Sequence, residues 1–486
     1  MDTLIVTTND QSFDYDIHSL VKAFFPECEV RLLRPEDAKD VSSSEGFPDV
    51  NIEFNEDMVF LTIIDKESKG LKIPISKDLE RGVLKNLVKR LIYSGISEHT
   101  GRTLPWGTLT GIRPVKIPMM LLDDASDEEI SEYMKEVYLV GDEKLKLSLD
   151  IAKREKRILS SIDHQNGYSL YVGIPFCPTR CLYCSFASYP IEKCQNKVDP
   201  YLEALFKEID YVSDLMNGRA PDTVYIGGGT PTALDDKRLD RLLKKIDERF
   251  DLSDIKELTV EAGRPDSITI PKLRVLKDHK VSRISVNPQS MNQKTLDTIG
   301  RAHSVESVKD TFLMARDEGF SNINMDIILG LPGEGREEVS YTTNEIEKLK
   351  PDSLTVHSLA IKRASLLAEK VRESGLKDLY NSDEIMKIAS DGAARMGMNP
   401  YYLYRQKNMS GNLENVGFAQ EGKEGIYNIL IMEEVQSIIA LGAGTVTKRV
   451  FGDGRIERCD NVKDIDLYIN KIDEMTERKK TLLGSR

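Results

Sequence analysis

The sequence has little of what a membrane-spanning or a secreted protein needs. Across its 486 residues no stretch approaches about 18 uninterrupted apolar residues, so we predict no membrane-spanning helix. The opening residues, MDTLIVTTND, do not place a basic segment before an apolar one, so we predict no secretory signal peptide. Together these two absences predict a cytoplasmic protein.

A surplus of positive charge is also absent. Lys plus Arg total 67 and Asp plus Glu total 80, which gives a net charge of −13. Binding to a nucleic-acid backbone needs clustered positive charge, so this balance argues against a nucleic-acid partner while leaving room for a local basic pocket. Hydrophobic residues make up 40% of the chain, which is enough to bury a sizeable core.

Cysteine is scarce but unevenly distributed. Six cysteines in a chain of this length are too few for a disulfide scaffold. Three of them fall within eight residues, at Cys177, Cys181 and Cys184. In a reducing compartment such a cluster indicates metal binding rather than disulfide bonds.

The chain divides into three regions by pattern. Residues 1–165 are predicted to form an N-terminal α+β domain with connecting helices. Residues 166–375 alternate β-rich runs with amphipathic helical stretches. Residues 376–486 are mixed and are predicted to form a C-terminal region that covers the substrate. In the N-terminal region an apolar segment lies at 4–6, strand-like runs lie at 28–33 and 57–65, and helical patterns lie at 18–25 and 79–94.

The middle region carries the clearest pattern. Its six β-rich runs lie at 169–174, 223–228, 256–262, 283–289, 323–329 and 353–359. Runs of this kind separated by helices indicate βαβ units and a parallel sheet. Six strands fall short of the eight in a full (β/α) barrel, so we predict a partial barrel or a doubly wound sheet.

The cysteine motif directly follows the first of these runs. Its spacing is Cys-x3-Cys-x2-Cys, and three thiolates on one loop can hold three irons of a [4Fe–4S] cluster while the fourth iron stays open to a small molecule. The alternative is a structural zinc site, which normally needs four ligands. Cys194 is the only nearby candidate for a fourth ligand. The spacing favours the cluster and leaves zinc open.

The motif and its surroundings resemble a known superfamily. With YVGIPFC before it, Tyr183 within it and GGGTPT further on, the cysteine motif resembles that of radical S-adenosylmethionine (SAM) proteins. Within that superfamily the chain is similar to the oxygen-independent coproporphyrinogen III oxidase family, and most to its HemZ-type branch. The resemblance covers 169–359, extends more weakly through LGAGTVTK, and includes WGTLTGIRPVK in the N-terminal region. It implies an α/β fold with a partial (β/α)6 radical SAM barrel.

The resemblance also implies the cofactors and their ligands. Cys177, Cys181 and Cys184 are expected to hold a [4Fe–4S] cluster, and the glycine-rich loop is expected to bind the methionine end of SAM. An arginine at the family's position suits a carboxylate, because its fork can bind two oxygens. The residues that fall where the family contacts SAM are Tyr171, Tyr183, Gly227, Gly228, Gly229, Thr230, Glu261, Gln289, Arg301 and Asp326.

The reaction that the resemblance implies belongs to porphyrin and haem biosynthesis. It is the oxidative decarboxylation of coproporphyrinogen III to protoporphyrinogen IX through a 5′-deoxyadenosyl radical. The expected partners are a tetrapyrrole substrate, a flavodoxin- or ferredoxin-like electron donor, and an electron acceptor. Arg405 is a candidate for binding a substrate propionate, with Lys362, Arg363 and Lys448 as competitors. His303 and His357 are interpreted as structural histidines, because nothing in the sequence pairs with them.

Two departures keep other functions open. The family's oxidases carry a histidine where Gly173 stands and a fourth cysteine where Phe186 stands. One alternative is a haem chaperone of the same family, which also lacks the fourth cysteine. Its pattern His-Asn-x-x-Tyr-Trp, however, corresponds here to Tyr-Asn-Ile-Leu-Ile-Met at 427–432. The other alternative is a radical SAM enzyme that acts on a different tetrapyrrole.

Overall fold

The computed structural model describes residues 2–39, 41–65, 68–76, 78–111, 113–186, 188–362, 364–374, 382–406 and 413–484. These residues form two compact units. The first comprises residues up to 153 together with a short segment that begins at Arg405. The second comprises 154–404 and the chain from Leu413 onward. Each unit has its own sheet.

The first unit is built on a five-stranded sheet with the order β2-β1-β3-β4-β5. The strands are β1 (Thr3–Thr8), β2 (Glu29–Leu33), β3 (Asp49–Phe54), β4 (Met58–Ile64) and β5 (Ser68–Pro74). β1 is parallel to both β2 and β3, whereas β3, β4 and β5 form an antiparallel meander. The predicted strands at 28–33 and 57–65 are present, and the apolar segment at 4–6 is part of β1. β3 and β5 were not predicted, although β3 alternates the buried Val50 and Ile52 with polar residues.

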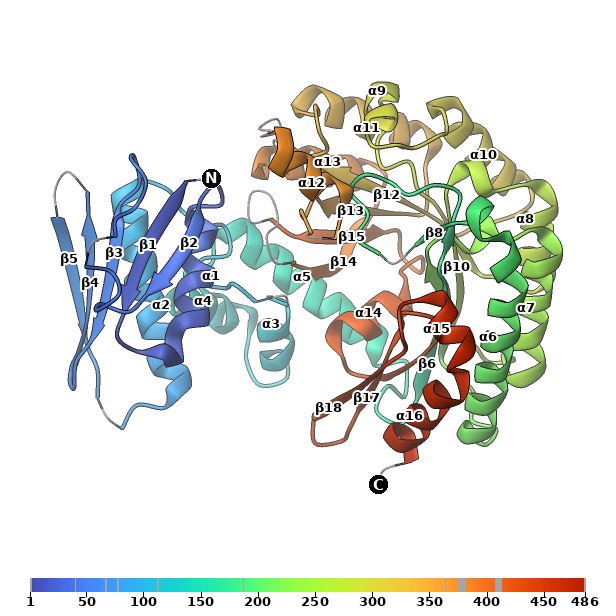
Figure 1. Cartoon of the computed structure of the whole chain (residues 1–486), viewed down its shortest axis with the longest axis horizontal. Coiled ribbons are helices and arrows are strands. Elements are labelled where there is room, and N and C mark those ends of the chain that lie inside the picture. The colour runs from blue at the N-terminus through green and yellow to red at the C-terminus, as the bar shows by residue number, and fades with distance from the viewer. Residues whose placement is uncertain are drawn as a thin grey trace. The chain divides into compact units, whose positions relative to one another are not determined.

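Two helices pack against this sheet, as Figure 1 shows in blue. They are α1 (Asp14–Phe24) and α2 (Arg81–Thr100). The core between helices and sheet includes Ile17 and Leu20 of α1, Ile92 of α2 and Leu61 of β4. The connecting helices are α3 (Lys116–Leu121), α4 (Asp127–Tyr138) and α5 (Asp142–Leu159). The prediction of an N-terminal α+β fold is confirmed.

The second unit is a curved sheet of 11 strands in the described chain, with the order β14-β15-β13-β12-β11-β10-β9-β6-β16-β17-β18. The six predicted runs become parallel strands: β6 (Tyr168–Ile174), β9 (Thr223–Gly228), β10 (Glu257–Gly263), β11 (Arg283–Val286), β12 (Ile323–Leu329) and β13 (Ser353–Ser358). The C-terminal part of the chain extends both edges of this sheet. It contributes β14 (Asn399–Tyr404), β15 (Asn415–Ala419), β16 (Ser437–Leu441), β17 (Val446–Val450) and β18 (Ile456–Asp460). β16 pairs in parallel with β6, whereas the four others pair antiparallel with their neighbours.

Helices cover the outside of the curved sheet, as the green to yellow ribbons of Figure 1 show. Those that follow the strands are α6 (Gln195–Met216), α7 (Asp236–Arg249), α8 (Ile270–Asp278), α9 (Gln293–Thr298), α10 (Val305–Asp317) and α11 (Arg336–Leu349). Later helices are α12 (Leu366–Ser374), α13 (Asp383–Arg395), α14 (Ile426–Glu433), α15 (Ile465–Asn470) and α16 (Ile472–Gly484). The short elements β7 (Phe176–Cys177), β8 (Tyr189–Pro190), η2 (Ile191–Cys194), η3 (Pro231–Ala233) and η4 (Pro265–Ser267) lie in loops. This architecture is the predicted partial (β/α)6 barrel, while the domain boundaries at 165 and 375 stay predictions.

The strand pattern explains why the inside of the barrel is polar. In β6, Leu170 and Val172 are fully buried, whereas Tyr171 between them is only half-buried. Because successive strand residues point to opposite faces, the apolar set packs against the helices and the alternate set faces the interior. α14 closes this interior near the start of β10, where the backbone N–H of Ile426 donates to Oε2 of Glu257 over 2.6 Å.

A buried ion pair fastens the last helix to the barrel. Nζ of Lys479 lies 2.7 Å from Oε1 of Glu208, and both side chains are fully buried. Glu208 also accepts hydrogen bonds from the backbone of Gly442, from Asn461 and from Tyr468. This network ties α16 to the loop after β16.

Among the described helices, none is both long and apolar enough to cross a membrane.

Candidate functional site

The three clustered cysteines lie on the loop that follows β6. Cys177 and Cys181 are 9% and 8% exposed, and Cys184 is more accessible. Burial raises the pKa values of the Cys177 and Cys184 thiols, and each is raised further by the charge of neighbouring thiols in the motif. The loop therefore presents three thiols from one short segment, and their charges influence one another. In the described chain no three His, Cys, Asp or Glu side chains are grouped as ligands of a single metal ion.

The glycine-rich loop after β9 packs directly against the cysteine loop. The backbone N–H groups of Gly229 and Thr230 donate to the carbonyls of Ile174 and Phe176, each over 2.7 Å. A Cβ atom at Gly229 would lie 2.6 Å from the Phe176 carbonyl oxygen and 3.0 Å from Sγ of Cys177. Glycine is required here because a side chain would displace the cysteine loop.

The hydroxyl of Thr230 makes a further contact with the motif. Its Oγ1 donates to Sγ of Cys177 over 3.5 Å. Gly228, two residues earlier, has φ +107, a backbone conformation that favours glycine. At Gly227 a Cβ would lie 3.1 Å from a carboxylate oxygen of Glu261, so the glycine-rich loop also packs against this predicted SAM residue.

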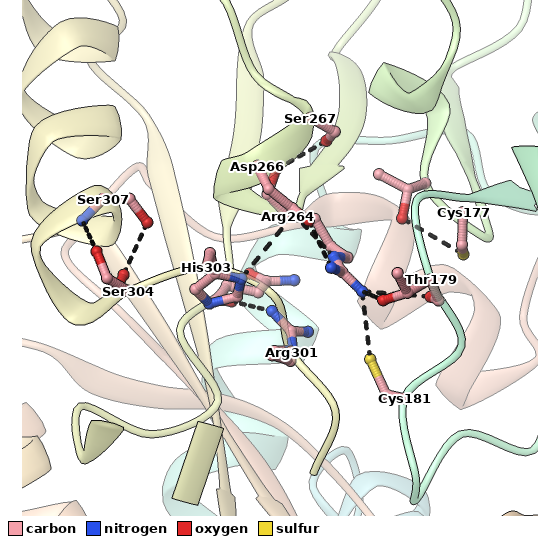
Figure 2. Close-up of polar contacts among 12 residues, drawn as sticks. Cys177, Thr179, Cys181, Arg264, Asp266, Ser267, Arg301, His303, Ser304 and Ser307 are labelled. Atoms are coloured by element: carbon pink, nitrogen blue, oxygen red, sulfur yellow. Dashed lines mark hydrogen bonds and ion pairs between the residues drawn. The ribbon is translucent and has the colours of Figure 1, made fainter. Parts of the chain in front are cut away.

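Arg264 connects the end of β10 to the cysteine loop (Figure 2). Its Nη1 donates to the carbonyl and to Oγ1 of Thr179 over 3.2 and 2.7 Å, and it lies 3.7 Å from Sγ of Cys181. Nε and Nη2 of the same guanidinium donate to the two carboxylate oxygens of Asp266 over 2.9 and 2.5 Å. Arg264 was not predicted as a site residue, because its only mark in the sequence is its place three residues after Glu261.

Arg301 joins the cysteine motif to the end of β11. Its Nη2 donates to the Tyr183 hydroxyl over 3.2 Å and its Nη1 to the carbonyl of Asn287 over 2.7 Å. Gln289 adopts φ +66, and its backbone pairs with Asp326 and Ile328 of β12. The structure thus brings the predicted residues Tyr183, Gln289, Arg301 and Asp326 into one continuous set of contacts.

Several polar atoms of this set are buried without a partner in the described chain. They are Oδ1 of Asn287, Oε1 of Gln289 and Nε of Arg301. A buried polar group without a hydrogen bond costs free energy, so such a group often marks the place of a ligand. Two acceptors and one cationic donor match the ammonium and carboxylate groups of an amino acid. The methionine portion of SAM carries both.

Glu261 lies inside the barrel among tyrosines. Its Oε1 accepts a hydrogen bond from the Tyr225 hydroxyl, and burial raises the pKa of Glu261 to about 7. The Tyr225 ring stacks on the rings of Tyr427 and Tyr171 at centroid distances of 4.5 and 6.1 Å. The predicted SAM residue Tyr171 is therefore part of an aromatic wall next to the Glu261 carboxyl.

The carboxylate of Asp326 is held by residues of β12 and β13. Asn324 donates to its Oδ1 over 2.7 Å, and Nε2 of His357 lies 3.8 Å from its Oδ2. Burial alone would raise the pKa of Asp326, but contacts with His357, Asn324 and Thr355 lower it below its ordinary value. No partner was predicted for His357, since the pairing depends on the register of two strands that are separated by a helix in the sequence.

The candidate substrate residue Arg405 belongs to the first unit. It is buried, and its Nη1 donates to the carbonyl of Leu109 over 2.5 Å. Of its competitors, Lys448 is 2.9 Å from Glu434, and Nζ of Lys362 lies 5.9 Å from the centre of the Phe186 ring. Arg363 is outside the described residues. A propionate contact at Arg405 stays a prediction.

Comparison with known proteins agrees with this geometry. Residues 171–346 match the family model of the radical SAM superfamily. The chain is 37% identical over 481 residues to the oxygen-independent coproporphyrinogen-III oxidase-like protein HemZ of Bacillus subtilis (strain 168), an alignment that covers 97% of this chain and 95% of the relative. It is 31% identical over 279 residues to the heme chaperone HemW of the same organism, with 57% and 69% covered.

A solved structure gives the same result. The crystallised coproporphyrinogen III oxidase (HemN) from Escherichia coli is similar with a TM-score of 0.52 and 25% identity, over 66% of this chain and 73% of that one. Fold, cysteine loop and family model therefore define a radical SAM protein. More narrowly, the chain belongs to the HemZ-like branch of the oxygen-independent coproporphyrinogen III oxidase family.

Proposed function

We propose that the protein is a radical SAM enzyme that converts coproporphyrinogen III to protoporphyrinogen IX by oxidative decarboxylation. The observation that carries the proposal is the contact between two halves of one site. Tyr183, which lies between Cys181 and Cys184 in the motif, accepts a hydrogen bond from Arg301, whose Nε is buried without a partner in the described residues. A cluster with an open iron and a SAM molecule need these two halves side by side.

The residues present fit both groups. Cys177, Cys181 and Cys184 would hold three irons of a [4Fe–4S] cluster. Arg301 would bind the SAM carboxylate, and Gln289 would accept a hydrogen bond from its ammonium. When bound, the two groups supply a carbon radical that can abstract a hydrogen atom from an unactivated C–H bond.

The barrel residues have separate tasks. Asp326, kept ionised by its contacts, would accept hydrogen bonds from hydroxyl groups of SAM. Tyr171, Tyr225 and Tyr427 form a wall that excludes water from the interior. A closed interior matters because a carbon radical abstracts hydrogen from almost any C–H bond within its reach. An electron donor of the flavodoxin or ferredoxin class, an electron acceptor and a cytoplasmic location belong to the same proposal.

A haem chaperone of the same family is the second candidate, and one feature supports it. The exposed Phe186 stands where the oxidases carry a fourth cysteine, which the chaperone also lacks. Gly173, which stands where the oxidases carry histidine, counts against decarboxylation without favouring the chaperone. One feature counts against it. The segment that corresponds to the chaperone's His-Asn-x-x-Tyr-Trp pattern lies in α14, where Tyr427 is buried and stacked on Tyr225.

An anaerobic turnover separates the candidates. Protein reconstituted with iron and sulfide would be incubated with SAM, a strong reductant and coproporphyrinogen III, with the Cys181→Ala variant as the matched control. We expect the tetrapyrrole to lose two carboxyl groups and 5′-deoxyadenosine to be released, in the unmodified protein only. Deoxyadenosine without decarboxylation would indicate another substrate. Stable haem binding with neither product would favour the chaperone.

A further inference from the structure

Arg264 is placed to act on the cluster through one of its cysteine ligands. Its side chain is 4% exposed, and Figure 2 shows its guanidinium lying between Asp266 and Cys181. Nη1 is 3.7 Å from Sγ of Cys181, which is within hydrogen-bonding distance for sulfur. A hydrogen bond from a charged donor to a thiolate is roughly twice as strong as one between neutral groups.

The surroundings fix this guanidinium in place. Asp266 binds it with both carboxylate oxygens, and Thr179 accepts from Nη1 with its carbonyl and its hydroxyl. Thr179 lies between Cys177 and Cys181 in the sequence. Nη1 of Arg264 therefore contacts the Cys181 sulfur and also holds the backbone of the cysteine loop. Arg301 has a different arrangement, because its Nη atoms donate to Asn287 and Tyr183.

We propose that Arg264 is a positioning residue that sets the reduction potential of the cluster through Cys181. Hydrogen bonds to the cysteine sulfurs and the net charge near a cluster are two of the factors that determine its potential. Reduction adds one negative charge to the cluster, and the Arg264 N–H and its positive charge stabilise that charge. Asp266 offsets part of this effect. The inference rests on the cluster-binding part of the proposed function and is independent of the tetrapyrrole.

Three variants test it. Arg264→Met removes donor and charge, Arg264→Lys keeps the charge but loses the fork, and Asp266→Asn removes the opposing charge. The matched control is Arg238→Met on α7, because Arg238 is clamped in the same two-oxygen manner by Asp199 on the outside of the barrel. Each protein would be reconstituted anaerobically and its iron and sulfide measured. A redox titration in the absence of substrate would follow the electron paramagnetic resonance signal of the reduced cluster.

At the midpoint potential of the unmodified protein, we expect the ratio of reduced to oxidised cluster to fall about tenfold in Arg264→Met, which equals ~59 mV for one electron. The ratio should fall less in Arg264→Lys, rise in Asp266→Asn and stay unchanged in Arg238→Met. A fully loaded Arg264→Met protein with the unmodified ratio would overturn the proposal.

The remaining outcomes are also decisive. If Arg264→Met assembles no cluster, the test rests on Arg264→Lys and Asp266→Asn. If both of these variants then show the same ratio of reduced to oxidised cluster as the unmodified protein, the proposal is overturned. Loss of the cluster from all three variants would assign Arg264 to loop construction alone and overturn the tuning role. An unmodified protein that takes up no iron and sulfide would instead refute the proposed function, so the two failures are distinguishable.

Discussion

The imidazole of His357 lies beside the carboxylate of Asp326, with Nε2 3.8 Å from Oδ2. The two side chains come from the adjacent parallel strands β13 and β12 and face the inside of the barrel. Both are partly exposed, so the pair is accessible to a bound molecule. If Asp326 contacts SAM as the family resemblance implies, His357 maintains the charged form that accepts hydrogen bonds.

The first prediction concerns this pair. In His357→Phe, Asp326 loses a contact that lowers its pKa, so its carboxylate becomes protonated at a higher pH. We expect the cluster-loaded variant to lose SAM affinity at a higher pH than the unmodified protein does, by about tenfold where the Asp326 carboxyl is protonated in the variant alone. Equilibrium dialysis with labelled SAM at several pH values measures this.

His279→Phe is the matched control for that experiment. His279 also pairs with two carboxylates, Asp240 and Asp247, but on the outer helix α7. Its replacement should leave SAM affinity unchanged at every pH. Equal losses in both variants would show that the effect is not specific to Asp326.

The second prediction separates the cluster from a zinc site. Cys181→Ala should abolish assembly of the [4Fe–4S] cluster and leave the far-ultraviolet circular dichroism spectrum unchanged, because the loop contributes little secondary structure. Cys194→Ala removes another buried cysteine, the only one near enough in sequence to complete a four-ligand zinc site. We expect it to keep its full iron and sulfide content. Loss of metal from Cys194→Ala would contradict the three-cysteine assignment.

The parallel part of the barrel could be predicted because each of its strands is a short apolar run bounded by turn residues. The prediction of a strand at 283–289 was too long, since β11 ends at Val286 and Gln289 turns into a left-handed conformation. That bend takes Gln289 out of the strand, and its Oε1 is buried without a partner in the described residues. The alternation of apolar residues cannot show that the strand ends before Gln289, because that ending depends on the contact of the Gln289 backbone with Asp326.

The site was predictable only where its residues carry a motif. The cysteine spacing and the glycine-rich loop are local patterns, and the structure packs them together. Arg264 and His357 have no such pattern around them. Their roles depend on contacts over long sequence separations, to Cys181 and Asp326, and on the strand register that brings them there.

The third prediction is a pH dependence of stability in the SAM-free protein. Burial raises the pKa of Glu261 to about 7, whereas an unfolded glutamate titrates near about 4.3. Between these two values the native state binds more protons than the unfolded state. The free energy of unfolding therefore falls as the pH rises through this window, by on the order of 3 kcal/mol in total. The slope should flatten in Glu261→Gln.

Urea unfolding followed by circular dichroism at several pH values checks this. Replacing a titrating carboxyl by an amide of the same shape removes the proton that is linked to folding. An identical pH slope in Glu261→Gln and the unmodified protein would show that Glu261 titrates normally in the fold.

The fourth prediction explains why glycine stands at 173, where the family's oxidases carry histidine. A Cβ there would lie 2.6 Å from Cγ2 of Thr445 and 3.4 Å from the carbonyl oxygen of Leu441. Thr445 therefore fills the space that a side chain at 173 would need. Overpacking of a buried site costs about 1–3 kcal/mol, so Gly173→Ala should lower the free energy of unfolding by that amount.

The compensating change in the chain is Thr445→Ser. It removes Cγ2 and keeps the hydroxyl that donates to the Gly442 carbonyl over 2.7 Å. The double variant Gly173→Ala with Thr445→Ser should recover much of the lost stability in urea unfolding, because the close contact is gone while the hydrogen bond remains. A double variant no more stable than Gly173→Ala alone would mean that the carbonyl of Leu441, rather than Thr445, excludes a side chain from position 173.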